Sequence, residues 1–281
     1  MIRWTRYVGS KQHFVEEFNK VTAGLDCETY VEPFFGSGAI FFNLTKTYKR
    51  YVINDSNPHV INALKAFYTA NYQVYKKAVD GVFSKFGDVK ANKPSYYAFR
   101  NWFNETYFDG KGDSVLEGLY FHMLMNSCIN SLVRIGPNGF NQSWGNRFLE
   151  LKEEEYNQIH EILRDRKPVF MSVDYSEVVE EYDGEDVLFF MDPPYFERPT
   201  VGYKQDVKGD KLKLFLERLK GMKGKIVYTD ILSVGHTEIE DWPAATTKEL
   251  KSVSPLRTEE VGASETYFRN FGETNKSLAL F

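Results

Sequence analysis

The chain has 281 residues, enough for a large buried core formed by one domain or by a domain with an insertion. No stretch approaches the roughly 18 apolar residues of a membrane-spanning helix, and no apolar signal region follows Met1, so we expect neither secretion nor a membrane partner. Cys27 and Cys128 have no metal-ligand spacing, which predicts two reduced thiols in a cytoplasmic protein without a metal. The formal net charge of −4 gives no support to a nucleic-acid partner.

The pattern of apolar residues predicts alternating helices and strands with a helical middle part. In chain order we expect a helix at 11–21, strands at 29–35 and 51–53 with a short helix at 39–44 between them, and a helix from 58. Helical patterns fill 72–108, with a break near 93–94, and a further helix starts at 114. Strands at 168–171, 186–191 and 225–228, a helix at 210–221 and an antiparallel pair at 246–251 and 265–271 follow. This order predicts a doubly wound α/β domain.

A buried strand at 186–191 ends in Asp192-Pro193-Pro194-Tyr195, the most informative segment of the chain. Because proline donates no backbone hydrogen bond, the strand stops there and leaves acceptors at its end. The Asp192 carboxylate and the Pro193 carbonyl suit the two hydrogens of an exocyclic amino group, and the Tyr195 ring can stack on a base. An adenine amino nitrogen gains electron density when both hydrogens point at acceptors. This segment therefore predicts chemistry at an aromatic amine.

A second motif, Gly36-Ser37-Gly38, lies between an expected strand and an expected helix. Glycine allows a close approach of the backbone to a ligand, and a helix start presents free N–H groups. Asp55 ends the next strand about 20 residues later, where nucleotide-type units bind a ribose diol. A phosphate-binding Gly-x-x-x-x-Gly-Lys run and a long dinucleotide fingerprint are both missing, which argues against ATP and NAD and favours S-adenosylmethionine (SAM).

With these motifs the chain resembles the DNA adenine-N6 methyltransferases of the Dam type, the D12 class, in which the SAM motif precedes the recognition region. Four motifs occur in that family's order: 7–11, 33–38 with Asp55, 130–145, and 192–195. The resemblance implies a mostly parallel seven-stranded sheet with a helical insertion that carries a β-hairpin. It also implies a SAM-binding catalytic domain at 1–67 and 150–281, and a target-recognition domain at 68–149.

The resemblance assigns residues to the cofactor SAM and to the catalytic site. The expected cofactor-binding residues are Tyr7, Gly9, Lys11, Pro33, Phe34, Phe35, Gly36, Ser37, Gly38, Asp55, Asp174, Tyr175 and Asp192. The expected catalytic residues are Asp192, Pro193, Pro194 and Tyr195. Methyl transfer leaves S-adenosylhomocysteine as the product, and neither a metal nor a covalent enzyme intermediate is needed.

The turn signal at 136–139 predicts a short hairpin, which can enter a major groove of double-stranded DNA. No Asp or Glu occurs between Glu117 and Glu150, so this part of the chain carries no charge that repels phosphate. We expect Tyr203 to lie in a lid at 196–208 over the target base. The expected DNA-binding residues are Asn130, Arg134, Asn138, Asn141, Gln142, Trp144, Arg147 and Tyr203.

The expected function is site-specific methylation of adenine N6 in DNA, with the base flipped out of the duplex, in a bacterial or phage-infected cytoplasm. Methylation of RNA bases or of a protein glutamine, and a non-catalytic SAM- or DNA-binding decoy, remain alternatives. Ser131 replaces the family's usual glycine, Ser143 and Trp144 replace a Pro-Phe pair, and Gly136 stands near a usual asparagine. These departures leave open the recognition sequence, for which the family suggests a GATC-like site. Restriction association and a homodimer on DNA are open as well.

Overall fold

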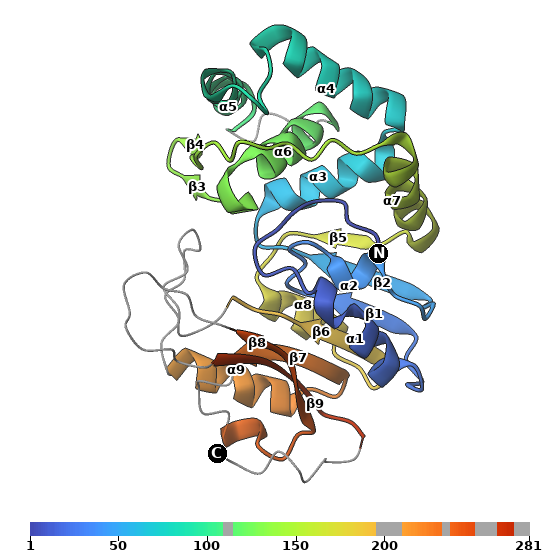
Figure 1. The fold of residues 1–281 in the computed structure, drawn as a ribbon. Coiled ribbons are helices and arrows are strands. Elements are labelled where there is room, and N and C mark those ends of the chain that lie inside the picture. The colour runs from blue at the N-terminus through green and yellow to red at the C-terminus, as the bar shows by residue number, and fades with distance from the viewer. Residues whose placement is uncertain (109–114, 195–209, 232–236, 251–262, 273–281) are drawn as a thin grey trace. The chain divides into compact units, whose positions relative to one another are not determined.

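The computed structural model describes residues 1–108, 115–194, 210–231, 237–250 and 263–272 (Figure 1). The chain divides into two compact units. Unit 1 comprises Met1–Gln12, Phe35–Leu44 and Asn54–Asp174. Unit 2 comprises His13–Phe34, Thr45–Ile53 and Tyr175–Phe281. The predicted insertion at 68–149 falls within unit 1, and its assignment as a separate recognition domain stays a prediction.

Seven of the described strands form one sheet in the order β5-β2-β1-β6-β7-β9-β8. Their bounds are β1 Thr29–Glu32, β2 Arg50–Asn54, β5 Val169–Met171, β6 Val187–Met191, β7 Lys225–Ile231, β8 Ala244–Leu250 and β9 Ala263–Arg269. Strand β1 pairs parallel with β2 and β6, and β6 pairs parallel with β7, whereas β9 runs antiparallel to β7 and β8. The predicted mostly parallel α/β fold with a closing antiparallel pair is confirmed.

The strand order reverses between β1 and β6, because the chain fills one side of the sheet before it returns to the other. Open α/β sheets bind their ligands beyond the carboxyl ends of the strands at such a point. Both strands end beside a proline: β1 stops at Glu32 before Pro33, and β6 stops at Met191 two residues before Pro193. The observed strand β1 is therefore shorter than the strand predicted at 29–35.

Three helices of unit 1 start at asparagine caps. The side chains of Asn57, Asn71 and Asn92 accept hydrogen bonds from backbone N–H groups of the first turns of α3, α4 and α5. The unit 1 helices are α2 Ala39–Phe42, α3 Pro58–Thr69, α4 Tyr72–Phe86, α5 Lys93–Tyr107, α6 Val115–Ser127, η2 Ile129–Ser131 and α7 Glu153–Arg166. Asparagine favours this position because its side-chain oxygen satisfies a donor that has no partner in the helix. The start of α3 at Asn57-Pro58 agrees with the sequence prediction.

Unit 2 packs helices on both faces of its strands (Figure 1). Its helices are η1 Gln12–Phe14, α1 Val15–Thr22, α8 Tyr175–Tyr182, α9 Asp210–Gly221 and η3 Thr237–Ile239. Phe18 of α1 contacts Phe190 on one face, and Phe215 of α9 contacts Tyr228 on the other, with ring centroids 5.3 and 5.5 Å apart. The helix predicted at 11–21 is α-helical only from Val15. No helix in the described ranges is long and apolar enough to cross a membrane.

Helices α3 and α6 pack closely in unit 1, and Gly118 of α6 allows this approach. A Cβ atom built on Gly118 would lie 2.5 Å from the carbonyl oxygen of Asn62 and 2.7 Å from the Cβ of Ala66. Nearby, Nε2 of the buried His122 donates to the Trp4 carbonyl across 2.8 Å, and burial lowers the pKa of His122 to about 4. The imidazole is therefore neutral at physiological pH.

We predict that Gly118→Ala destabilises the protein by about 1–3 kcal/mol, because the added methyl group overlaps a backbone carbonyl that cannot rotate away. Gly81→Ala on α4 is the matched control. A Cβ there would meet nothing within 4 Å, so the change should be neutral or stabilise by up to about 1 kcal/mol. Urea unfolding measures both variants. Equal midpoints for Gly118→Ala and the wild type would contradict the packing argument.

Candidate functional site

The glycine loop after β1 has a conformation that requires glycine. Gly36 and Gly38 have φ values of +49° and +57°, in the left-handed region. A Cβ on Gly38 would lie 2.2 Å from the Phe35 ring, and the Gly38 N–H donates to the Phe35 carbonyl across 2.7 Å. The loop is therefore tight, and it leads directly into α2. No side chain larger than a hydrogen fits at Gly38 in this conformation.

Asp55 lies beside this loop, as the sequence predicted. Its Oδ2 accepts from the Gly36 N–H across 3.0 Å, and its Oδ1 accepts from the Asn57 N–H across 2.9 Å. The half-buried side chain is poorly solvated, and this desolvation raises the pKa of Asp55 to about 6 despite the two hydrogen bonds. Each carboxylate oxygen keeps a further lone pair, so Asp55 can still accept from a ligand hydroxyl.

The N-terminal segment lies against the same loop in unit 1. The Tyr7 ring is 3.3 Å from the position of a Cβ on Gly36. The Ser37 hydroxyl donates to the Ser10 hydroxyl across 3.0 Å, and the Trp4 indole donates to the Ser37 carbonyl across 2.8 Å. Sequence reasoning missed Trp4 and Ser10 as partners of the loop. Their only signal was their place in or just before the motif at 7–11.

The remaining cofactor candidates divide between the two units. In unit 1, Lys11 is buried and donates to the Gly9 carbonyl across 3.2 Å, and Asp174 is exposed after β5. In unit 2, the rings of Phe34 and Tyr175 lie 5.2 Å apart between centroids. Phe34 also contacts Phe215 of α9, which fixes the aromatic residue that follows Pro33.

Asp192 follows the carboxyl end of β6, next to the end of β1 in the parallel register that pairs Val31 with Phe189. The Asp192 side chain is half-buried, Pro193 is buried and Pro194 is exposed. The Thr229 hydroxyl of β7 donates to Asp192 Oδ1 across 2.8 Å. Tyr195, Tyr203 and the predicted lid at 196–208 lie outside the described residues.

The predicted hairpin is present in unit 1. Strand β3 (Ile135–Gly136) pairs antiparallel with β4 (Gly139–Phe140) around a two-residue turn, and the Asn141 N–H extends the pairing to the Arg134 carbonyl across 3.1 Å. Four of the predicted DNA-binding side chains are exposed in this region: Asn130, Arg134, Asn138 and Asn141.

Helix α5 holds the hairpin through its backbone. The Asn104 side chain accepts from the Phe140 N–H and donates to the Phe140 carbonyl, both across 2.9 Å. One and two turns earlier, Arg100 and Tyr96 donate to the Gln142 carbonyl across 3.4 and 2.8 Å. Because these residues recur every four positions, one face of α5 bonds a continuous stretch of strand.

Three other predicted DNA-binding side chains form hydrogen bonds within the protein. Gln142 is buried, and its Oε1 accepts from the Ser143 N–H across 3.3 Å. The Trp144 indole donates to the Val89 carbonyl across 3.1 Å, and Arg147 Nη2 donates to the Cys128 carbonyl across 3.3 Å. These bonds favour a supporting role for the three side chains, because groups bonded inside the protein present little to a base edge.

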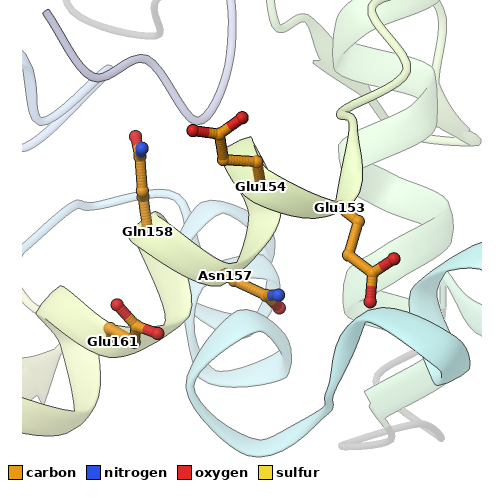
Figure 2. A pocket seen from close by; sticks show the side chains of 5 residues that line it. All are labelled: Glu153, Glu154, Asn157, Gln158 and Glu161. Atoms are coloured by element: carbon orange, nitrogen blue, oxygen red, sulfur yellow. The ribbon is translucent and has the colours of Figure 1, made fainter.

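A surface hollow lies along α7 in unit 1 (Figure 2). Figure 2 shows that it is lined by Glu153, Glu154, Asn157, Gln158 and Glu161. Three carboxylates on one helix repel a phosphate backbone, so this hollow is no candidate for DNA. Among the residues that the structure describes, no group of three or more His, Cys, Asp or Glu side chains could hold a metal ion.

A mostly parallel sheet with a glycine loop after β1, an acidic residue after β2 and Asp192 after β6 defines an α/β methyltransferase. The sequence model of the D12 class N6 adenine-specific DNA methyltransferases matches residues 7–258, and the chain belongs to this family. Among its relatives, Type II methyltransferase M.CviBI of a Paramecium bursaria Chlorella virus is 28% identical over 200 residues, 69% of this chain and 68% of the relative.

Two further relatives support the same family. Type II methyltransferase M.MjaIII of Methanocaldococcus jannaschii is 29% identical over 181 residues, 59% of this chain and 58% of the relative. The DNA adenine methylase of Haemophilus influenzae is 27% identical over 197 residues, 68% of this chain and 62% of the relative. The chain thus aligns with about three fifths of the length of these two relatives. The prediction of an adenine-specific DNA methyltransferase is confirmed at the level of the family, which implies SAM as methyl donor.

Ser131, which stands where the family usually has glycine, has a strained backbone. Ser131 has a φ of +51°, its side chain is buried, and among the described residues its hydroxyl has no hydrogen-bond partner. A left-handed conformation costs an L-residue about 1–2 kcal/mol, and a buried unsatisfied hydroxyl costs about 1–3 kcal/mol. Glycine removes both costs but gains freedom in the unfolded chain.

We therefore predict that Ser131→Gly raises the free energy of unfolding by about 1 kcal/mol. Ser127→Gly is the matched control, because Ser127 is buried in α6 and its hydroxyl donates to the Met123 carbonyl across 2.6 Å. That change should destabilise by about 1–2 kcal/mol. Chemical unfolding measures the free energy of unfolding of both variants. A Ser131→Gly variant that is less stable than the wild type would refute the prediction.

Proposed function

We propose that this protein methylates the N6 amino group of adenine at specific sites in double-stranded DNA, with SAM as donor and S-adenosylhomocysteine as product. The observation that carries the proposal is a half-buried carboxylate, Asp192, at the carboxyl end of the strand next to the switch point, hydrogen-bonded by Thr229 and followed by two prolines. Family membership supports the substrate class. We also propose that the protein acts in the cytoplasm of a bacterium or of a phage-infected cell.

In this mechanism Asp192 accepts one hydrogen of the target amine and the Pro193 carbonyl accepts the other. The nitrogen lone pair then loses conjugation with the ring and can attack the methyl carbon of the donor. In this direct displacement the carbon–sulfur bond breaks as the carbon–nitrogen bond forms, the electron pair goes to sulfur, and the methylated nitrogen loses one proton to water. An adenine inside a duplex cannot reach these acceptors, so it is flipped out at a cost of a few kcal/mol. Alignment of the two reacting atoms can supply about 7–11 kcal/mol of the rate acceleration.

The residues around the glycine loop fit a nucleoside with a ribose diol. Asp55 has further lone pairs beside the loop, and the two left-handed positions of the loop are glycines. We assign to SAM the loop residues Pro33, Phe34, Phe35, Gly36, Ser37 and Gly38, together with Tyr7, Gly9, Lys11, Asp174 and Tyr175. SAM supplies an electrophilic methyl group. The protein residues bind it, orient it and exclude water.

Sequence recognition is assigned to the exposed residues of the hairpin region. Arginine pairs with guanine and asparagine with adenine in a major groove, which suits Arg134, Asn138 and Asn141. Asn130, just before the strained Ser131, is exposed on the same segment. Tyr195 is proposed to stack on the flipped base.

Asp192→Ala should lower the methyl-transfer rate to DNA by about 100-fold or more, because one of the two acceptors for the amine is lost. Transfer of labelled methyl groups from SAM to DNA, RNA and protein acceptors measures it. Asp165→Asn, an exposed carboxylate of α7, is the control and should keep full activity. Thermal unfolding and SAM binding confirm that the inactive variant is folded. An active Asp192→Ala, or transfer only to RNA or protein, would reject the proposal.

The affinity for SAM should fall as pH is lowered through about 6, the raised pKa of Asp55. Ribose hydroxyls donate more strongly to the ionised carboxylate, which predominates above this pH, so protonation weakens binding by up to tenfold per pH unit below it. Titration calorimetry from pH 5 to pH 8 measures the profile. Asp55→Asn should bind more weakly at pH 8 and lose this dependence. Parallel profiles for the two proteins would contradict the role of Asp55.

A further inference from the structure

A threonine on the neighbouring strand is bonded to the proposed catalytic carboxylate. The parallel register of β6 and β7 pairs Met191 with Tyr228, so one further step along both strands sets Asp192 beside Thr229. The Thr229 hydroxyl donates to Asp192 Oδ1 across 2.8 Å. Thr229 is fully buried, whereas Asp192 is half-buried, so the hydroxyl contacts the carboxylate from the protein side.

This bond restricts the orientation of the Asp192 carboxylate. A carboxylate rotates about its Cα–Cβ and Cβ–Cγ bonds, and either oxygen can accept. A buried donor on Oδ1 restricts that rotation. A hydrogen bond from a neutral hydroxyl also favours the ionised form of the carboxylate, which is the form that accepts only.

We propose that Thr229 is a positioning residue for methyl transfer: its hydroxyl holds the Asp192 carboxylate in the orientation in which it accepts a hydrogen of the target amine. This rests on the proposed function of Asp192. Thr229 touches neither the substrate nor the cofactor in this scheme and acts only through Asp192.

Other ionisable side chains on the surrounding strands have partners of their own. Glu32 of β1 accepts from the Tyr30 hydroxyl across 2.8 Å, and Asp230 of β7 accepts from the Tyr228 hydroxyl. Glu265 of β9 is bonded to His13. A substitution that removes only the Thr229 hydroxyl leaves all three arrangements in place, so a change in the pH profile reports on Asp192.

Thr229→Val is nearly isosteric and keeps a β-branched residue in the strand. Thr229→Ser restores a hydroxyl without the methyl group. Thr266→Val is the matched control: Thr266 lies on β9 in register with Asp230, it is also buried, and among the described residues its hydroxyl has no hydrogen-bond partner. All three proteins are compared with the wild type by kinetics and by thermal unfolding.

We expect Thr229→Val to lower kcat by about 10–100-fold, the range of a lost hydrogen bond to a charged group. KM for DNA and for SAM should change less than about threefold, since neither ligand loses a contact. The acid limb of the kcat–pH profile should move to higher pH, because the ionised carboxylate loses a donor. Thr229→Ser should recover most of the rate and the original acid limb, and Thr266→Val should match the wild type.

The outcomes separate this inference from the function on which it rests. If Asp192→Ala is inactive while Thr229→Val matches Thr266→Val in rate and pH profile, the positioning role is wrong and the function of Asp192 stands. If Thr229→Val is slow but its acid limb is unmoved and serine restores nothing, the residue is merely structural and the inference is overturned. If Asp192→Ala is active, the proposed function itself fails.

Discussion

The structure depends on the parallel pairing of two strands that both end beside a proline. Strands β1 and β6 are neighbours in register, so their carboxyl ends lie at the same edge of the sheet. Pro33 and Pro193 cannot donate to a neighbouring strand, and the chain therefore leaves the sheet on both sides of the switch point. Asp192 is placed at this edge by the register, with Pro193 buried next to it. The proposed chemistry needs a rigid acceptor, and the paired, buried β6 provides it.

The sequence predicts correctly those elements that start or end at a residue with a strong local preference. Proline ends a strand wherever it occurs, asparagine before proline caps a helix, and two left-handed positions in a tight loop call for glycine at 36 and 38. The fold followed from the alternation of such signals. The position of Asp55 beside the glycine loop follows from its spacing, which one βαβ unit fixes, and its role in binding the cofactor stays a prediction. The strand β1 was predicted too long because its apolar pattern continues through Phe34 and Phe35, which pack on helices and rings instead.

The contacts that the sequence did not reveal all join residues far apart in the chain. Thr229 lies 37 positions after Asp192, and only the β6–β7 register shows that the two are adjacent. Gln142 and Trp144 have the residue types of base contacts, yet Gln142 is buried and Trp144 bonds to Val89. A two-stranded hairpin is marginally stable alone. Its backbone is bonded by α5 through Asn104, 36 positions from Phe140, and sequence periodicity carries no information on such a pairing.

The net charge of −4 is compatible with a DNA partner because charge acts locally. Exposed charges further apart than a Debye length, about 10 Å at 0.1 M salt, are largely screened from each other. Several of the acids of unit 1 are concentrated on α7, where Glu153, Glu154 and Glu161 line the hollow in Figure 2. The stretch from Gly118 to Leu149 has no acid, and it carries the exposed Arg134 and four exposed asparagines. Asparagine contributes little electrostatic attraction, so in the proposed recognition role this surface would gain affinity largely from base contacts. It would then select for sequence more than bind tightly to DNA in general.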